Sequence, residues 1–420
     1  MPEQAAAALI LNDFCYVQGG ASKVAIDEAI ALHHAGLDVT FVGAVGEPCE
    51  ALRDAGVRVI SLGQAELLQV WRHPSAAMRA AWNNEAFAAT RSLLGHSDPA
   101  RTIVHLHGYT KALSTSPALA ARLAGFATLC TLHDFFGACP NGALYDYRRE
   151  EPCQRRALSV SCMVTNCDKR HPLHKSYRVF RALVQRHFAL FPRSVRDFIA
   201  LSRRSAELLR PYLAADSRLY PLTNIVDVAH AAPVDVAAND RLLVLGRLDA
   251  EKGVTLAATA ARQAGIPIMF AGEGPLRAAA EASGATVTGW LDGGGVWQAL
   301  GQARCLVFPS RWYETFGLVV DEAAARGVPA IVSDISAAAE RVEDGVTGWI
   351  FRSGDADDLT RCMRLTGDHA RVAAAGAAAH ARFWADPPDR GRHVRDLLAV
   401  YDQVLARERA AGNTQGTLAS

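Results

Sequence analysis

The chain has 420 residues, of which 50% are hydrophobic and 21% are charged, so it is neither largely disordered nor fibrous, and its length is typical of two domains. The formal net charge of +1, from 44 basic and 43 acidic residues, gives no sign of nucleic-acid binding. No apolar run approaches the roughly 20 residues of a membrane span, and no basic stretch typical of a signal peptide precedes the first apolar run. We therefore expect a cytoplasmic protein whose cysteines are reduced.

The first half of the chain alternates short apolar runs with Ala- and Leu-rich segments. Strands are predicted at 8–14, 39–44, 58–63, 102–108 and 127–134, and the first helix at 22–32. Because these runs lack polar alternation and are separated by helices, they predict a parallel sheet covered on both faces.

The same alternation restarts after about residue 220. Strands are predicted at 241–246, 266–272, 305–309 and 329–333, and helices at 255–264, 275–283, 317–326 and 355–365. The fold class is therefore α/β, with two Rossmann-like, doubly wound domains that face each other across a cleft. Ligands of such sheets bind beyond the carboxyl ends of the strands, so the cleft is the expected site.

These patterns divide the chain into four parts. The expected boundaries are an N-terminal domain at 1–218 with an irregular insert at about 135–200, a C-terminal domain at 219–390, a helix at 391–408 that crosses back to the first domain, and a mobile tail at 409–420.

One segment, residues 305–334, predicts an anion site at the mouth of the cleft. It has the pattern of a strand, a loop, a helix and a second strand, and Gly327 and Pro329 mark the end of the helix. The helix therefore begins near Phe316 and Gly317, where free backbone N–H groups and the helix dipole attract negative charge.

Two carboxylates accompany this helix, Glu314 in the preceding loop and Glu322 inside the helix. They would accept hydrogen bonds from sugar hydroxyls, as an acidic residue does from ribose in dinucleotide-binding sites. The alternative is that both are solvated surface acids.

A diphosphate leaving group needs a positive partner, and the sequence offers two side chains for this role. Arg247 and Lys252 lie in the loop after a predicted strand. Their alternative is a surface turn in which Asp249 contacts Lys252. The Asp-x-Asp pair at Asp355 and Asp357, a pattern that could hold Mg²⁺, is better explained as the cap and first turn of a helix.

Four motifs of the second half resemble those of family 4 retaining glycosyltransferases, which have the GT-B fold: GRLDAEKG, FAGEGP, FPSRWYETFGLVVDEAAARGVPAIVSD and DGVTGWIF. GGASKVA and TLHD resemble the first half of that family more loosely. The resemblance implies that the nucleotide sugar lies mainly on the second domain and the acceptor on the first.

The resemblance also assigns roles to individual residues. Glu314 matches the residue that contacts the donor sugar, and Glu322 the one that binds the ribose hydroxyls, while Arg247 and Lys252 match the diphosphate-binding pair. The remaining donor contacts match Phe316, Gly317 and Leu318 as backbone donors to phosphate and sugar, Gly272 and Glu273 near the base, and Gly19 and Gly20 in the turn that closes on the phosphate.

His133 matches the cleft histidine near the sugar, and completes an implied catalytic set with Glu314, Lys252 and Arg247. Taken alone, a histidine at a strand end is as readily explained as part of the core. His105 and His107 are interpreted as structural.

The implied reaction is a retaining, metal-independent transfer of a hexose from a UDP- or GDP-linked donor to a sugar, lipid-linked or small-molecule acceptor in cell-envelope or exopolysaccharide synthesis. The leaving phosphate would act as the base, so Glu314 would serve in positioning and electrostatics. No cofactor is expected for catalysis. The alternatives are a non-catalytic nucleotide-sugar-binding protein and a sugar phosphorylase or epimerase of the same fold.

Four of the nine cysteines, Cys139, Cys153, Cys162 and Cys167, fall within 29 residues. Such density in a cytosolic chain suggests a closed, structural zinc site. The spacing is not that of paired C-x2-C knuckles, and unligated thiols or a disulfide remain the alternatives.

The segment 169–196 that follows has eight Lys or Arg residues and no acid, with aromatic residues at Tyr177, Phe180, Phe188 and Phe191. A basic amphipathic helix of this kind can lie on the anionic inner face of the membrane or bind an anionic acceptor. The alternative is a solvated helix whose aromatic residues belong to the core.

Overall fold

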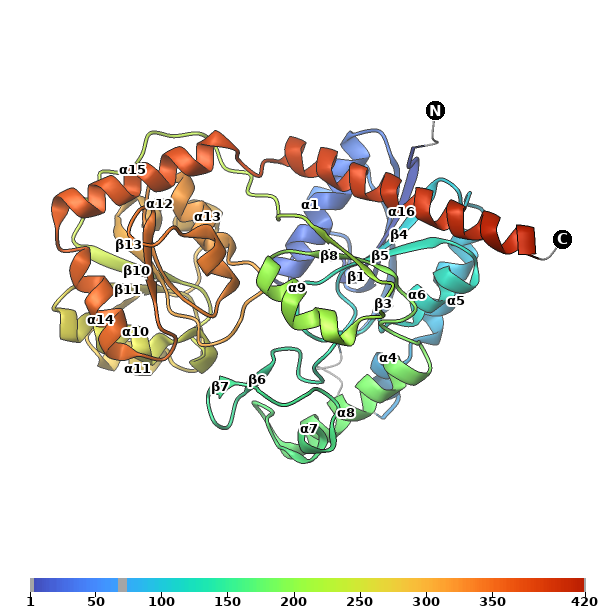
Figure 1. Ribbon diagram of the computed structural model, residues 1–420, viewed down its shortest axis with the longest axis horizontal. Helices are drawn as coiled ribbons and strands as arrows, with labels where there is room; N and C mark the ends of the chain where they lie inside the picture. The colour runs from blue at the N-terminus through green and yellow to red at the C-terminus, as the bar shows by residue number, and fades with distance from the viewer. Residues whose placement is uncertain (1–3, 67–73, 419–420) are drawn as a thin grey trace.

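The computed structural model describes residues 4–66 and 74–418, which form two α/β domains (Figure 1). Each domain is built on one parallel sheet. The first sheet has the strand order β3-β2-β1-β4-β5-β8-β9 and the second the order β12-β11-β10-β13-β14-β15. These are the two doubly wound units that the apolar runs predict.

The central strands of the first sheet are almost entirely buried, as continuous apolar runs require, whereas the two edge strands are partly exposed. They are β1 (Ala7–Phe14), β2 (Asp38–Val45), β3 (Arg58–Gln64), β4 (Thr102–Leu106), β5 (Ala127–Thr131), β8 (Asp197–Ala200) and β9 (Arg218–Pro221). The helices are α1 (Gly20–His34), α2 (Glu50–Asp54), α4 (Pro74–Ala81), α5 (Asn84–Leu94), α6 (Ser116–Leu123) and α9 (Arg203–Leu209). The strand order reverses between β1 and β4, so loops diverge there and leave room for a ligand.

The second domain repeats this plan, with its reversal between β10 and β13. Its strands are β10 (Arg241–Leu245), β11 (Ile268–Ala271), β12 (Thr286–Val287), β13 (Ala303–Phe308), β14 (Ala330–Ser333) and β15 (Gly348–Phe351). Its helices are α10 (Val254–Ala264), α11 (Arg277–Ala282), α12 (Gly293–Gly301), α13 (Leu318–Ala325), α14 (Ala356–Leu365) and α15 (His369–Ala385). Asp355 caps α14 by accepting a hydrogen bond from the amide of Asp358 at 3.0 Å.

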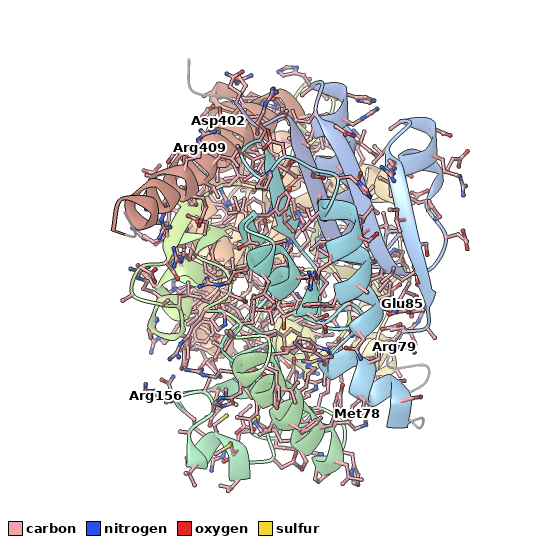
Figure 2. All side chains as sticks on the ribbon, turned by 90° about the vertical axis from the view of Figure 1, so that its right-hand side faces the viewer. Met78, Arg79, Glu85, Arg156, Asp402 and Arg409 are labelled. Atoms are coloured by element: carbon pink, nitrogen blue, oxygen red, sulfur yellow. The ribbon has the colours of Figure 1, made fainter. Side chains whose placement is uncertain are left out.

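Helix α16 (Arg390–Leu418) begins at the edge of the second domain and runs over the first domain (Figures 1 and 2). The Tyr401 side chain is fully buried among first-domain residues. Asp402 accepts a hydrogen bond from the amide of Ala5 at 2.9 Å, and Arg409 donates one to the carbonyl of Ala100 at 3.1 Å. These contacts fasten the end of the chain to the start of the sheet.

Two of the sequence-derived boundaries differ from the structure. Strand β9 extends the first sheet to Pro221, beyond the boundary placed at 218. The segment from 409, expected to be a mobile tail, continues α16 to Leu418. Residues 419–420 lie outside the described part.

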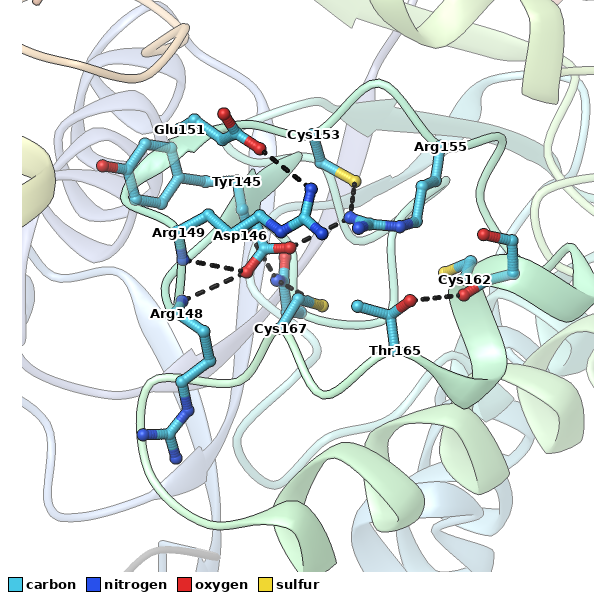
Figure 3. A network of polar contacts seen from close by, with 12 residues as sticks. Tyr145, Asp146, Arg148, Arg149, Glu151, Cys153, Arg155, Cys162, Thr165 and Cys167 are labelled. Carbon is cyan, nitrogen blue, oxygen red and sulfur yellow. Dashed lines mark hydrogen bonds and ion pairs between the residues drawn. The ribbon is translucent and has the colours of Figure 1, made fainter.

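An irregular insert leaves the first sheet after β5 and returns to it at β8. It contains β6 (Tyr145–Asp146), β7 (Glu151–Pro152), α7 (Val160–Val164) and α8 (Pro172–His187). Because β8 pairs with β5, residues 197–200 belong to the sheet and not to the insert, which was expected to reach 200. Within the insert, Asp146 accepts hydrogen bonds from Arg155 at 2.9 Å and from the amide of Arg148 at 3.1 Å (Figure 3).

No helix in the described ranges combines the length and apolar character needed to cross a membrane.

Candidate functional site at the domain cleft

The start of α13 has the geometry of an anion site. Gly317, which precedes the helix, has a φ of 101°, a left-handed conformation that favours glycine. A Cβ atom at this position would also lie 2.9 Å from the Cβ atom of Ala338. The N–H groups of the first turn have no partner within a helix, so those that begin at Leu318 can bind phosphate oxygens.

Glu314 is held rigidly in the loop before this helix. Its side-chain atom Oε1 accepts hydrogen bonds from Lys252 Nζ at 2.5 Å, and from Ser310 Oγ and Trp312 Nε1 at 2.7 Å each. The residue is 8% exposed and has a φ of 51°. A left-handed backbone costs a non-glycine residue about 1–3 kcal/mol and is found mainly where function requires it.

Arg247 lies in the same loop as Lys252 but has different partners. Its guanidinium group pairs with Asp249 at 2.5 Å and with Glu251 at 3.6 Å. Lys169 of the insert pairs with the other Asp249 oxygen at 2.6 Å. The two domains are therefore joined by charge at the cleft, through a lysine that the sequence motifs did not single out.

Two glycines allow the loops of the second domain to pack closely. A Cβ atom at Gly272 would lie 1.8 Å from the carbonyl oxygen of Gly246. One at Gly253, which has a φ of 71°, would lie 2.0 Å from the carbonyl oxygen of Pro309. A larger residue at Gly253 would therefore separate the loop that carries Lys252 from the loop that carries Glu314.

The remaining residues expected to bind the nucleotide sugar differ in their burial and in their partners. Glu273 forms an exposed ion pair with Arg277. A Cβ atom at Gly19 or Gly20, where α1 begins, would meet nothing within 4 Å, so this turn faces open space. Glu322 is partly buried, and burial raises its pKa while Lys23 of α1 acts to lower it.

The loop that carries Glu314 docks against the first domain. Thr315 Oγ1 donates a hydrogen bond to the carbonyl oxygen of His133 at 3.0 Å. Phe135 meets the rings of Trp312 and Tyr313 edge-on, at centroid distances of 6.5 and 6.4 Å. The structure thus brings His133 to the side of the cleft that faces the Glu314 loop.

His133 is also the outer end of a buried chain of polar contacts. Its Nε2 lies 2.9 Å from His107 Nδ1, and His107 Nε2 lies 3.3 Å from a carboxylate oxygen of Glu28. The other Glu28 oxygen lies 3.0 Å from His393 Nε2, and His393 Nδ1 donates to the carbonyl of Thr223. The chain therefore runs from the cleft, through α1, to the crossover helix α16.

The charges along this chain follow from burial and from the neighbouring groups. Burial lowers the pKa of His133 to about 3, so this ring is neutral. Burial acts to raise the pKa of Glu28, but His107 and His393 hold it well below its usual value. Burial acts to lower the pKa of His393, yet Glu28 keeps it above its usual value. A carboxylate thus joins two histidines in the core.

Glu28, His105 and His107 are the only trio of His, Cys, Asp and Glu side chains in the described ranges whose potential ligand atoms lie within 4.8 Å of one another. Both ring nitrogens of His105 are engaged by other groups, with Tyr401 at 2.9 Å and Thr131 at 2.7 Å. His105 is thus held by hydrogen bonds, whereas Glu28 Oε2 and His107 Nε2 have no hydrogen-bond partner among the described residues.

Among the described residues, no three of the four insert cysteines have Sγ atoms that all lie within 4.8 Å of one another. Lys175 lies between two of them, with its Nζ 3.3 Å from Cys167 Sγ and 3.7 Å from Cys162 Sγ. Cys153 accepts a weak bond from Arg155 at 3.8 Å (Figure 3). A bound zinc would require Lys175 to move aside, so zinc remains an expectation here.

Helix α8 presents its polar side to the protein. Lys175 and Arg181 are buried, whereas Phe180 and Phe188 are 43% and 70% exposed. The interpretation that places these aromatic residues in the core is therefore wrong for Phe180 and Phe188, and correct for Phe191, which is buried. The physical reason is that the polar side chains find partners inside, including the two thiols.

Comparison with known proteins agrees with this geometry. Residues 239–366 match the family model for glycosyl transferases group 1. The phosphatidyl-myo-inositol mannosyltransferase of Mycobacterium leprae is 32% identical over 120 residues, which are 28% of this chain and 31% of that protein. The curated relatives are matched over only 21% to 38% of their length.

Solved structures match nearly the whole chain. Sucrose-phosphate synthase from Thermosynechococcus elongatus covers 96% of this chain and 100% of its own, with a TM-score of 0.68 and 19% identity. Alr3699/HepE of Anabaena, in complex with UDP and glucose, covers 94% and 99%, with a TM-score of 0.64 and 15% identity. The whole chain therefore has the fold of these solved structures, and its second domain matches the family model for glycosyl transferases group 1.

Proposed function

We propose that the chain transfers a hexose from a UDP- or GDP-linked donor to an acceptor, with retention of anomeric configuration and without a required metal ion. The observation that carries this proposal is the Lys252–Glu314 pair beside the start of α13. It offers a cation and free amides to a diphosphate, and a fixed carboxylate to a sugar hydroxyl.

In this proposal the bond between the anomeric carbon and the diphosphate oxygen breaks, and a bond from the acceptor oxygen to that carbon forms. The acceptor proton passes to the leaving phosphate. Lys252, Arg247 and the amides of Phe316, Gly317 and Leu318 stabilise the charge that develops on the diphosphate. Arg247 must exchange part of its contact with Asp249 for the phosphate.

The other residues hold the donor in place. Glu322 accepts hydrogen bonds from ribose, Glu273 and Gly272 lie near the base, and the open turn at Gly19 and Gly20 closes over the phosphate. Neutral His133 contacts the sugar from the first domain. The complex of Alr3699/HepE with UDP and glucose supports a uridine nucleotide as the donor.

The acceptor would bind to the first domain as a glycan or a lipid-linked molecule, in cell-envelope or exopolysaccharide synthesis. Exposed apolar residues on the insert support contact with the inner membrane surface: Val160 and Val164 of α7 are 72% and 78% exposed, and Leu173 of α8 is 67% exposed. A cytoplasmic enzyme that visits the membrane surface would fit this distribution.

The test is a screen of UDP- and GDP-hexoses for thermal stabilisation, followed by an assay for release of the nucleoside diphosphate. A transferase releases the nucleoside diphosphate on turnover and has a higher melting temperature when its donor is bound. An epimerase changes the donor without acceptor, a phosphorylase requires inorganic phosphate, and a binding protein gives stabilisation without turnover; any of these results would contradict the proposal. Metal analysis of protein purified without chelators tests the proposed structural zinc site. One zinc ion per chain would support the site, and protein without zinc would contradict it.

A further inference from the structure

A second cavity lies in the first domain, between α8 and the loops that follow β4 and β5. Its volume is about 200 Å³. Cationic and aromatic side chains dominate its lining, and none of the described residues that line it is acidic. The six that carry the argument are Lys111, Arg170, Arg178, Arg181, Phe136 and Tyr177. A cavity of this size is smaller than the roughly 300–1,000 Å³ that hold whole drug-sized ligands, so it fits one group of a larger molecule.

Arg181 gives the cavity a buried donor without a partner. Its side chain is 5% exposed, and its guanidinium group lies 4.8 Å from the ring centroid of Phe136. One terminal nitrogen donates to the carbonyl oxygen of Thr110 at 2.8 Å, but the buried Nε has no hydrogen-bond partner. Burial lowers the pKa of Arg181, and Arg178 acts in the same direction, whereas Tyr177, Tyr109 and Asp13 act to raise it. A buried donor of this kind is rare in folded proteins and calls for an acceptor.

The positive charges of the cavity exceed their partners. Arg178 pairs with Asp168 at 3.2 Å, and Lys111 pairs loosely with Glu66 at 3.8 Å. In the part of the chain that the structure describes, Arg170 and Arg181 form no ion pair. Two guanidinium groups are therefore left for an external anion, and a guanidinium group matches the paired oxygens of a phosphate.

The loops that line the cavity also reach the cleft. The loop after β4 contains His107 and continues to Lys111, and the loop after β5 contains His133 and continues to Phe136. The cavity is therefore a few residues along the second loop from His133, which the proposed function places beside the sugar, and a few residues along the first loop from His107, its hydrogen-bond partner.

We propose that this cavity binds a phosphate group carried by the acceptor. That the phosphate belongs to an acceptor rests on the proposed function, whereas the presence of a phosphate site rests on the cavity alone. Leu173 forms an exposed apolar rim, and Phe180 is exposed on the same helix. The site therefore suits an acceptor in which a phosphate joins a polar head to an apolar part.

The test compares phosphate binding by the wild type, K111Q/R170Q and the control R186Q, with UDP present to block the donor site. Lys111 is 41% exposed by its side chain and Arg170 is also exposed, so neither charge that is removed is buried, although Glu66 loses its loose pairing with Lys111. Arg186 is on α8 but does not line the cavity. Glucose 1-phosphate is titrated by calorimetry, with glucose as the neutral probe. We expect binding to weaken at least about tenfold in K111Q/R170Q and to be unchanged in R186Q.

A second arm uses phosphatidylcholine vesicles with and without phosphatidic acid, and separates a soluble phosphate from a lipid phosphate. If K111Q/R170Q, but not R186Q, loses binding to vesicles that contain phosphatidic acid, the phosphate is carried by a lipid. If K111Q/R170Q, but not R186Q, loses binding of glucose 1-phosphate, the phosphate is carried by a soluble molecule. Binding of neither probe, equal binding of glucose, or equal loss in R186Q overturns the proposal. UDP binding is measured separately, so its failure in the wild type would contradict the proposed function and leave the comparison of variants intact.

Discussion

Replacement of Lys252 by alanine and of Glu314 by glutamine should separate binding of the diphosphate from transfer of the sugar. Lys252 Nζ is bonded to Glu314 Oε1 at 2.5 Å, and the two side chains are 22% and 11% exposed. Glutamine keeps the oxygen that accepts from Ser310 and Trp312, so the loop should retain its shape. The two substitutions therefore remove one charge each from the same pair.

The expected magnitudes follow from the position of each charge. At an effective dielectric constant of about 20, a cation about 5 Å from a phosphate charge contributes about 3 kcal/mol, so Lys252→Ala should weaken UDP binding and reduce kcat/KM by at least about 100-fold. Glu314→Gln removes a negative charge beside the diphosphate and frees Lys252. UDP should then bind as well as or better than in the wild type, whereas transfer should still fall by about 100-fold, because the sugar loses its carboxylate.

The assay pairs calorimetric titration of UDP with steady-state release of UDP from the donor that the screen identifies. Glu281→Gln is the matched control, because Glu281 is half-exposed on the same domain and pairs with Arg277. Near-normal transfer by both variants would refute the assignment of the site. An equal loss of UDP affinity in both variants would refute the separate roles of the two residues.

Two further predictions concern the buried chain behind the cleft. Glu28→Ala should lower the free energy of unfolding by about 3 kcal/mol, because it removes the buried carboxylate that accepts from His393 and lies beside His107. Asp27→Asn should change the free energy of unfolding by less than about 0.5 kcal/mol. Denaturant titration checks both, and equal effects would contradict the network. Because burial depresses the pKa of His133 to about 3, its contribution to stability is complete above about pH 6.5 and is lost as the pH falls toward 3. Lowering the pH from 7.5 to 5.5 should therefore cost the wild type about 1 kcal/mol more than His133→Gln, and an equal loss in both proteins would contradict it.

Much of the fold could be predicted from sequence because its signals are local. The apolar runs of the two sheets have no polar alternation, and this pattern occurs only where both faces of a sheet are covered. The start of α13 was also visible, since Gly317 marks its beginning and Gly327 its end. These signals depend on neighbouring residues and on backbone geometry, so tertiary contacts did not alter them.

Features that depend on distant partners could not be predicted in this way. Glu28 has the sequence setting of a surface acid in an Ala-rich helix, yet it meets His393, which is 365 positions away. Helix α8 has the pattern of an amphipathic helix with an aromatic core face, but Lys175 and Arg181 turn inward to contacts with the thiols and with Thr110. In both cases the decisive partner comes from another element, and no local periodicity reports it.

A crystal structure with a bound UDP-hexose would test the central claim most directly. The account predicts that the diphosphate lies within hydrogen-bonding distance of Lys252 and of the amides that begin α13, with the ribose at Glu322 and the sugar beside Glu314 and His133. A nucleotide sugar bound elsewhere on the chain, with this cleft left to solvent, would contradict it.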